Sequence, residues 1–210
     1  NLFTASIVAL DVYTGEYRWH FQQVHHDIWD FDAPNPVVLF DLDYNSVLRK
    51  GLAQAGKTGW VYILDRISGG PLVGIDERPV PQEPRQATAA TQPYPAGDSF
   101  VSQTLDIPPE GFRLVNNGAI FTPFWEDPVL LRRSEANWPP STVDPVKGVM
   151  YVCAGERQAA YSTREGVEQV ENGERYTGGS MSFAPIAVTG VVAAMDLRTN
   201  QRLWSTRWAG

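Results

Sequence analysis

Cysteine is nearly absent from this 210-residue chain, which contains Cys153 and no other. A single thiol excludes a disulfide within these residues and excludes the Cys-x-x-Cys-His motif that attaches a c-type haem. Cys153 lies in an apolar stretch, so we expect it to be an inert core residue. Long apolar runs are also missing, which excludes a membrane-spanning helix within this sequence.

Positive charge is scarce as well. The 17 lysines and arginines are outnumbered by 24 aspartates and glutamates, which gives a formal net charge of −7. Because a nucleic-acid surface needs a basic patch, we expect no nucleic-acid partner. The remaining composition, 43% hydrophobic and 20% charged, is typical of a globular protein with one or two domains.

A convincing helical period is the third absence. The best helix candidate, residues 164–176, is polar, and residues 165–174 are interpreted as a solvated charged stretch without a site. Short apolar or alternating segments predict strands instead, and Pro- and Gly-rich connections separate them. These segments are SIVALDV, YRWHFQQV, GWVYILDR, GVMYVCAG, GVVAAMDL and RLWSTRW.

One pattern occurs three times, as ALDVYTGEYRW, ILDRISGGPLV and AMDLRTNQRLW. In each copy an Asp is followed by two variable residues, then by Ser or Thr and then by Gly or Asn, which is typical of a turn with one residue at positive φ. We therefore interpret Asp11, Asp65 and Asp196 as turn caps and not as acid/base groups. Trp19 and Trp204, which end two copies, are expected to wedge between neighbouring sheets.

Repeated hairpins of this kind predict an all-β fold, with residues 1–210 forming a β-propeller segment of roughly three to four blades. Between the second and third copies, low hydrophobicity predicts an extended loop excursion near residues 76–105, and KGVMYVCAG, residues 147–155, predicts a degenerate repeat. A partial ring would expose sheet edges. Because the chain also starts without an apolar leader and ends in strand-like LWSTRWAG, we expect the remaining blades to come from the same polypeptide.

The segment VHHDIWDFDAPNP, residues 24–36, concentrates three carboxylates and two adjacent histidines just after a predicted strand. His25 and His26 could bind a metal, but adjacent strand residues point to opposite faces, so structural hydrogen bonding is the favoured interpretation. Taken alone, Asp30 would be a loop carboxylate and Lys57 an ordinary surface lysine.

Several motifs in order along the chain resemble the pyrroloquinoline quinone (PQQ)-dependent dehydrogenases, periplasmic eight-bladed propellers that oxidise alcohols or sugars. The resemblance rests on the repeat together with HHDIWDFDAPNP, GKTGWVYILDR, ERPVPQ, GAIFTP and ANWPPSTVDPVKGVMYV, and it looks closest to the glucose-dehydrogenase-like branch. It implies that Asp30 is the catalytic base and a metal ligand, that Lys57 contacts the ortho-quinone oxygens, and that Asn137 contacts the cofactor. Trp138 stays open between stacking on the quinone and ordinary packing.

The resemblance also implies a metal ion held by Asp30 and Asp32, with calcium expected and a lanthanide or magnesium as alternatives. It further implies an alcohol, polyol or sugar substrate, cytochrome c or a membrane quinone as electron acceptor, and a periplasmic location. The glucose enzymes carry an acid at the position of Asn137, so the substrate within the branch stays open. The residue types suit the chemistry, because a carboxylate can take a hydroxyl proton while a lysine and a metal stabilise negative charge.

Two other functions remain as alternatives. A non-catalytic propeller that serves as a scaffold for protein partners would use the same repeat, but it would have no reason to keep HHDIWDFD, Lys57 and the ANW loop together. A glycosidase would need a second carboxylate to pair with Asp30, and the sequence identifies none.

Overall fold

The computed structural model describes residues 2–105, 110, 112, 114–125, 128–163, 173, 178–184 and 188–209. Within these ranges the regular elements are antiparallel strands and two 3-10 helices, η1 (Pro84–Gln86) and η2 (Asn116–Gly118), so the all-β prediction is confirmed. Neither helix has the length or the apolar character that a bilayer crossing needs, and the described residues contain no other. The polar helix candidate at residues 164–176 lies outside the described residues apart from position 173.

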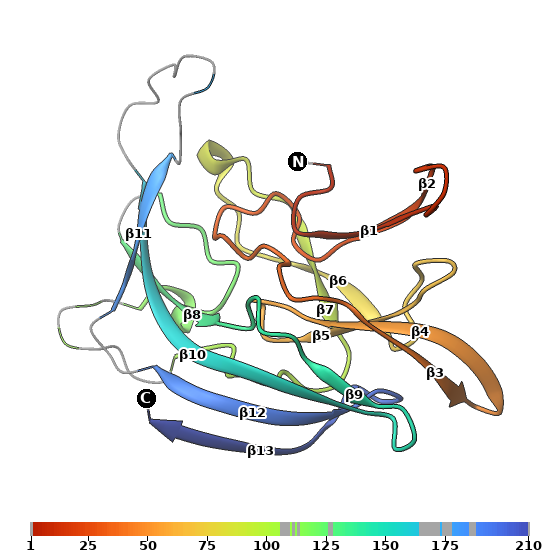
Figure 1. Cartoon of the computed structure of the whole chain (residues 1–210). Coiled ribbons are helices and arrows are strands. Elements are labelled where there is room, and N and C mark those ends of the chain that lie inside the picture. The colour runs from red at the N-terminus through yellow and green to blue at the C-terminus, as the bar shows by residue number, and fades with distance from the viewer. Residues whose placement is uncertain are drawn as a thin grey trace.

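Three small sheets are formed by the first half of the chain (Figure 1). They are β1 (Ser6–Leu10) with β2 (Tyr17–Gln22); β3 (Val38–Tyr44), β4 (Val47–Ala55) and β5 (Val61–Asp65); and β6 (Ile75–Pro79) with β7 (Thr91–Pro95).

The fourth sheet is built around one long curved strand, β10 (Val149–Thr163) (Figure 1). The strands that pair with β10 are β8 (Val129–Ser134), β9 (Thr142–Asp144), β11 (Gly179–Phe183) and β12 (Thr189–Asp196), while β13 (Arg202–Ala209) pairs with β12.

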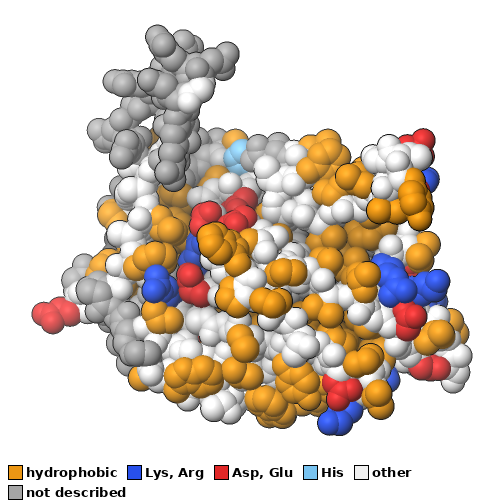
Figure 2. Space-filling view, viewed as in Figure 1, with side chains coloured by type: hydrophobic (Ala, Val, Ile, Leu, Met, Phe, Trp, Pro, Cys, Tyr) orange, Lys and Arg blue, Asp and Glu red, His pale blue; other side chains and the backbone are white. Residues whose placement is uncertain are grey.

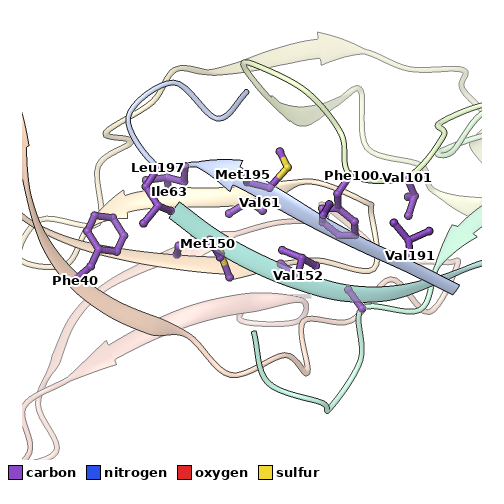
Figure 3. Close-up of a cluster of buried hydrophobic side chains, with 14 of the residues drawn as sticks. Phe40, Val61, Ile63, Phe100, Val101, Met150, Val152, Val191, Met195 and Leu197 are labelled. Carbon is purple, nitrogen blue, oxygen red and sulfur yellow. The ribbon is translucent and has the colours of Figure 1, made fainter. Parts of the chain in front are cut away.

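The main hydrophobic core lies between this sheet and the β3–β5 sheet. Val61 and Ile63 of β5 belong to one buried cluster with Met150 of β10 and Val191 and Met195 of β12 (Figure 3). The cluster is possible because β5 and the first half of β10 present branched and apolar side chains on one face. Burial of this interface joins sheets that are far apart in the sequence.

The expected turn caps are confirmed by short-range hydrogen bonds. The Oδ1 atom of each Asp accepts from a backbone N–H three residues later: Thr14 for Asp11 at 3.0 Å, Ser68 for Asp65 at 3.0 Å, and Thr199 for Asp196 at 2.9 Å. Four residues after each Asp, the chain adopts a positive φ, at Gly15, Gly69 and Asn200.

The degenerate repeat expected near residues 147–155 is present and starts slightly earlier. Asp144 Oδ1 accepts from Lys147 N at 3.0 Å, and Gly148 has a φ of 70°. The turn leads directly into β10. It is a fourth copy of the same Asp-capped turn, with Val146 and Lys147 between the Asp and the Gly where the other copies carry different residues. Across the four copies the shared feature is an Asp followed four residues later by Gly or Asn, not the full pattern.

The two repeat tryptophans behave differently. Trp19 is buried and its ring lies over Gly69, as expected for a residue wedged between sheets. Trp204 is 48% exposed, and the described residues provide no second sheet against it, so its wedging between sheets stays a prediction. It lies on β13, which pairs only with β12 there and leaves one face uncovered; Figure 2 shows hydrophobic side chains on that edge of the molecule.

We expect Gly69→Ala to destabilise the protein more than Gly15→Ala. Both glycines occupy the same repeat position with φ of 76° and 72°, so each alanine costs about 1–2 kcal/mol of backbone strain. A Cβ at Gly69 would also lie 2.6 Å from the Trp19 ring, whereas at Gly15 nothing lies within 4 Å. Overpacking should add about 1–3 kcal/mol at Gly69 alone. Equal losses in chemical denaturation of the two variants would contradict the Trp19 contact.

Two expectations differ from the structure. The excursion near residues 76–105 contains the β6–β7 sheet, and Phe100 and Val101 at its end are fully buried, so it is not simply a surface loop. Its prolines are tolerated because a two-stranded sheet has two edges that need no ladder donor. Cys153 is exposed and not a core residue, since the alternation of β10 turns Val152 inward and Cys153 outward.

Candidate active site

The loop between β2 and β3 buries its aromatic side chains and exposes two carboxylates. Trp29 and Phe31 are fully buried, and the Trp29 indole N–H donates to the Thr122 carbonyl at 2.8 Å. The side chains of Asp30 and Asp32 are 59% and 48% exposed. Asp30 has a φ of 60°, a left-handed conformation that aspartate tolerates better than most residues. The buried aromatics thus fix a loop whose acids face outward.

Lys57 meets these acids from the turn between β4 and β5. Its side chain is 6% exposed, and its Nζ lies 3.4 Å from Asp30 Oδ2 and also contacts Asp32 Oδ1. The Lys57 carbonyl accepts from Ser134 N at 3.2 Å, which ties this turn to the end of β8. The structure therefore brings together Asp30, Asp32 and Lys57, three of the residues singled out in the sequence.

A second buried cation, Arg133 of β8, also reaches the site. Its Nη2 lies 2.6 Å from Asp30 Oδ2, and its side chain is 3% exposed, whereas that of Asp30 is 59% exposed. Burial alone would raise the pKa of Asp30, but the charges of Arg133 and Lys57 outweigh it and lower that pKa. Asp30 is consequently an accessible, ionised carboxylate with two cations behind it.

Neighbouring groups have shifted pKa values of the opposite sense. Burial raises the pKa of Asp27, whose Oδ1 accepts from Trp29 N at 2.9 Å. Burial also raises the pKa of Tyr161 to about 12, so its hydroxyl stays protonated and donates to the Trp29 carbonyl at 2.9 Å. Asp30 is therefore ionised as well as exposed, so it can accept a proton from a hydroxyl group that approaches it, whereas Asp27 is held within the loop.

Asn137 and Trp138 lie on the loop that follows β8, and they do not touch the carboxylates. In the part of the chain that is described, no hydrogen bond or ion pair joins them to Asp30, Asp32 or Lys57. The Asn137 side chain is half-buried, its Oδ1 has no partner there, and Trp138 is 76% exposed. Trp138 is thus open to a ligand, whereas the Asn137 Oδ1 atom is buried and unpaired, and the cofactor contacts predicted for both residues stay predictions.

Asn35 connects this loop to the acidic one. It is buried, and its Nδ2 donates to the carbonyls of Asn137 at 2.9 Å and Pro139 at 2.8 Å. On its other side, the Asn35 carbonyl accepts from Gln54 Nε2. These bonds fix the position of the loop that follows β8 relative to the loop between β2 and β3.

We expect Asn35→Ala to weaken cofactor binding without affecting Asp30 directly. Loss of both donated bonds leaves the Asn137 and Pro139 carbonyls unpaired and should cost about 1–3 kcal/mol in the free energy of unfolding. The loosened loop should raise the Kd for the cofactor, measured by equilibrium dialysis. Asn45→Gly, in the exposed turn between β3 and β4, is the control, because glycine removes the amide and accepts the φ of 53° at this position. An unchanged Kd would contradict the role of Asn35.

The adjacent histidines hold the loop in place. His25 Nε2 pairs with Glu77 at 3.0 Å, and His26 Nε2 pairs with the Gln86 carbonyl at 3.1 Å. The residues described contain no group of three or more His, Cys, Asp or Glu side chains that could hold a metal. These contacts agree with the structural interpretation of His25 and His26, and they give the β6–β7 region a role in supporting the loop.

Three residues of this site were missed in the sequence: Arg133, Asn35 and Tyr161. Arg133 lies in LLRRSE, where two adjacent arginines on a strand must face opposite sides, so one of them had to point inward. That pattern was the available signal. Nothing local marked Asn35 or Tyr161, whose bonds to Asn137 and Trp29 join residues more than 100 positions apart.

Comparison with known proteins finds similar sequences and similar structures. The sequence model of the family described as "PQQ: Glucose/ethanol/alcohol dehydrogenase, beta-propeller domain" matches residues 1–185. Among curated proteins, the chain is 34% identical over 105 residues to the quinoprotein glucose dehydrogenase of Escherichia coli K12, covering 50% of this chain and 13% of that protein. It is 38% identical over 103 residues to the glycerol dehydrogenase large subunit of Gluconobacter oxydans 621H, covering 46% of this chain and 14% of that protein.

A solved structure shows the same fold. The crystal structure of quinohemoprotein alcohol dehydrogenase from Comamonas testosteroni superposes with a TM-score of 0.64 at 22% identity, covering 99% of this chain and 29% of that one. The predicted β-propeller segment is therefore confirmed. In each comparison the chain spans less than a third of the relative's length.

Proposed function

The chain belongs to the PQQ family of glucose, ethanol and alcohol dehydrogenase β-propeller domains, and we propose that it forms part of a periplasmic enzyme that oxidises an alcohol, polyol or sugar with PQQ. The observation that carries the proposal is the cluster in which the exposed Asp30 carboxylate lies against the buried Lys57 and Arg133 cations. Its relatives' substrates include a sugar and a polyol by name, which supports this substrate range.

Asp30 would act as the general base. Oxidation of a C–OH group requires removal of the hydroxyl proton while a hydride leaves carbon, and Asp30 is ionised and open to solvent. Lys57 would place positive charge beside the electron acceptor, where negative charge develops during reduction. The electrons would then pass to cytochrome c or a membrane quinone.

The residues of this segment fit one part of a binding site for an anionic redox cofactor. The Lys57 ammonium is a suitable partner for quinone oxygens, and the unpaired Asn137 Oδ1 is an acceptor suited to a polar ligand. PQQ, when bound, supplies the two-electron acceptor that the protein side chains lack. Asn137 and Trp138 would contact its periphery.

Asp30 and Asp32 would hold the metal ion, which would polarise the acceptor. Carboxylate oxygens suit calcium, with a lanthanide or magnesium as alternatives, but calcium takes about six to eight oxygen ligands. Two carboxylates are therefore only part of such a site, and other residues of the protein would complete it. The exposed apolar faces of β1–β2 and β13 are where the remaining blades would pack.

The test is reconstitution of the full-length protein with PQQ and calcium, followed by dye reduction with alcohols, polyols and aldoses. We expect turnover that requires PQQ and a metal, and exchange of calcium for magnesium or a lanthanide would identify the metal. Failure to bind PQQ in equilibrium dialysis would overturn the proposal and favour the non-catalytic scaffold.

The pH profile should show an acid limb at unusually low pH. A base works in its ionised form, so activity is present above the pKa of Asp30 and is lost as pH falls through it. Because Arg133 and Lys57 lower that pKa against the effect of burial, the limb of kcat/KM should lie below about pH 4, the ordinary aspartate value. Return to neutral pH must restore activity. An acid limb centred above about pH 5 would contradict this electrostatic arrangement.

A further inference from the structure

Arg133 is enclosed on all sides by acceptors. Its guanidinium donates to the Trp29 carbonyl at 2.9 Å, to the Asp30 carbonyl at 2.8 Å and to Asp30 Oδ2 at 2.6 Å. It also donates to the Tyr161 hydroxyl at 3.0 Å and to Glu135 at 3.2 Å. Since guanidinium carries five N–H donors in a rigid fork, no other side chain could satisfy this set.

Two of these contacts hold one short piece of backbone, and a third holds the carboxylate that it carries. Trp29 and Asp30 carry carbonyls that point at Arg133, and Asp30 has a φ of 60°, a conformation that is maintained only when its surroundings enforce it. The ring of Phe31 lies 5.8 Å from the guanidinium carbon and closes the other side. Arg133 therefore binds both the backbone of the left-handed turn and the Asp30 carboxylate.

The five N–H donors of Arg133 are all used by these protein acceptors, so none is left for direct contact with a substrate or a flat cofactor. Any effect it has on the reaction must pass through Asp30, whose side chain is largely exposed. Lys57 differs, because it belongs to the turn between β4 and β5 and approaches the carboxylates from another sheet. The two cations thus have separate tasks.

We propose that Arg133 is a positioning residue: from β8 it fixes the backbone and carboxylate of Asp30 so that the exposed oxygen meets the substrate hydroxyl. The proposal rests on the proposed function, in which Asp30 is the base. In this proposal a residue of β8, in the sheet centred on β10, orients a side chain that belongs to the loop after β2.

The experiment compares Arg133→Met, Arg133→Lys and Arg132→Met in the full-length protein. Arg132 is the matched control, because it is the neighbouring arginine on β8 and its Nε donates to the Thr104 carbonyl, away from Asp30. In the loaded enzyme, Arg133→Met should lower kcat by about 10- to 100-fold, the loss expected when a reacting group is misplaced by about 1 Å. KM and the PQQ Kd should stay within about threefold, since Arg133 touches neither ligand.

The second readout uses the protein without cofactor. Hydrogen exchange of peptides that cover residues 27–36 should be faster in Arg133→Met than in the unmodified protein, while peptides of β4, β5 and β12 stay unchanged. Arg133→Lys should fall between them, because one ammonium can pair with the carboxylate but cannot also reach both carbonyls. Arg132→Met should match the unmodified protein in both readouts.

Unchanged kcat and unchanged loop exchange in Arg133→Met would overturn the proposal. Faster exchange throughout the sheets, with cofactor binding lost, would also overturn it, because it would make Arg133 a general stabilising residue. If Arg133→Met does not fold, Arg133→Lys decides by the same criteria. Should the unmodified protein bind no PQQ, the proposed function fails, whereas the exchange experiment still tests whether Arg133 holds the loop.

Discussion

Asp30→Asn should abolish nearly all turnover while the protein still binds its cofactor. Asparagine keeps the size and the left-handed preference of the residue but cannot accept the hydroxyl proton, so kcat should fall by about 10²- to 10⁴-fold. The variant should still fold, because Lys57 retains its ion pair with Asp32. Arg133 likewise retains its hydrogen bonds to the Trp29 and Asp30 carbonyls. The measurement is dye reduction at saturating substrate, alongside equilibrium dialysis of PQQ.

Asp76→Asn is the control for this substitution. Asp76 is an exposed acid on β6 that pairs with Arg78 at 3.2 Å, so its loss removes the same charge and one ion pair away from the site. It should leave kcat and the PQQ Kd unchanged. Turnover of Asp30→Asn equal to that of the control would refute the assignment of Asp30 as base, and another carboxylate would have to be sought.

The parts of the fold that the sequence predicted are those encoded by local contacts. Each turn cap bonds a backbone N–H within three residues, so Asp11, Asp65 and Asp196 could be assigned without tertiary information. The strands β3 and β4 were not singled out. In β4, VLRKGLAQA shows no clear alternation along its length, whereas VLFDLDY of β3 alternates and was an available signal. Burial of the second half of β4 comes from packing against the sheet centred on β10.

The only site residues that could be predicted from the sequence were those in motifs that resemble the PQQ-dependent dehydrogenases. Asp30, Asp32 and Lys57 came from matched motifs, and the structure brings them together, although their roles stay predictions. Arg133 could not be found this way, since its partner Asp30 lies 103 residues earlier and only the fold joins them. Trp204 illustrates the opposite limit: its repeat position predicts a wedge, but a wedge needs a second sheet to enter.

Lys57→Met is the second substitution with a large expected effect. It removes the ammonium that lies between Asp30 and Asp32, so stabilisation of the reduced acceptor is lost and kcat should fall by about 10²- to 10³-fold. Two carboxylates would then face each other with Arg133 as the remaining close cation among the described residues. The pKa of Asp30 should rise, and the acid limb of kcat/KM should move to higher pH.

Lys57→Arg and Lys50→Met separate charge from position. Arginine keeps the positive charge in the buried turn and should recover part of kcat and the low acid limb. Lys50 is exposed on β4, so its loss removes a charge from the same sheet without touching the carboxylates. If Lys57→Met and Lys50→Met had the same kcat and the same acid limb of kcat/KM, Lys57 would be only a structural partner of the loop. Stabilisation of the reduced acceptor would then have to come from the metal and from the residues that complete its site.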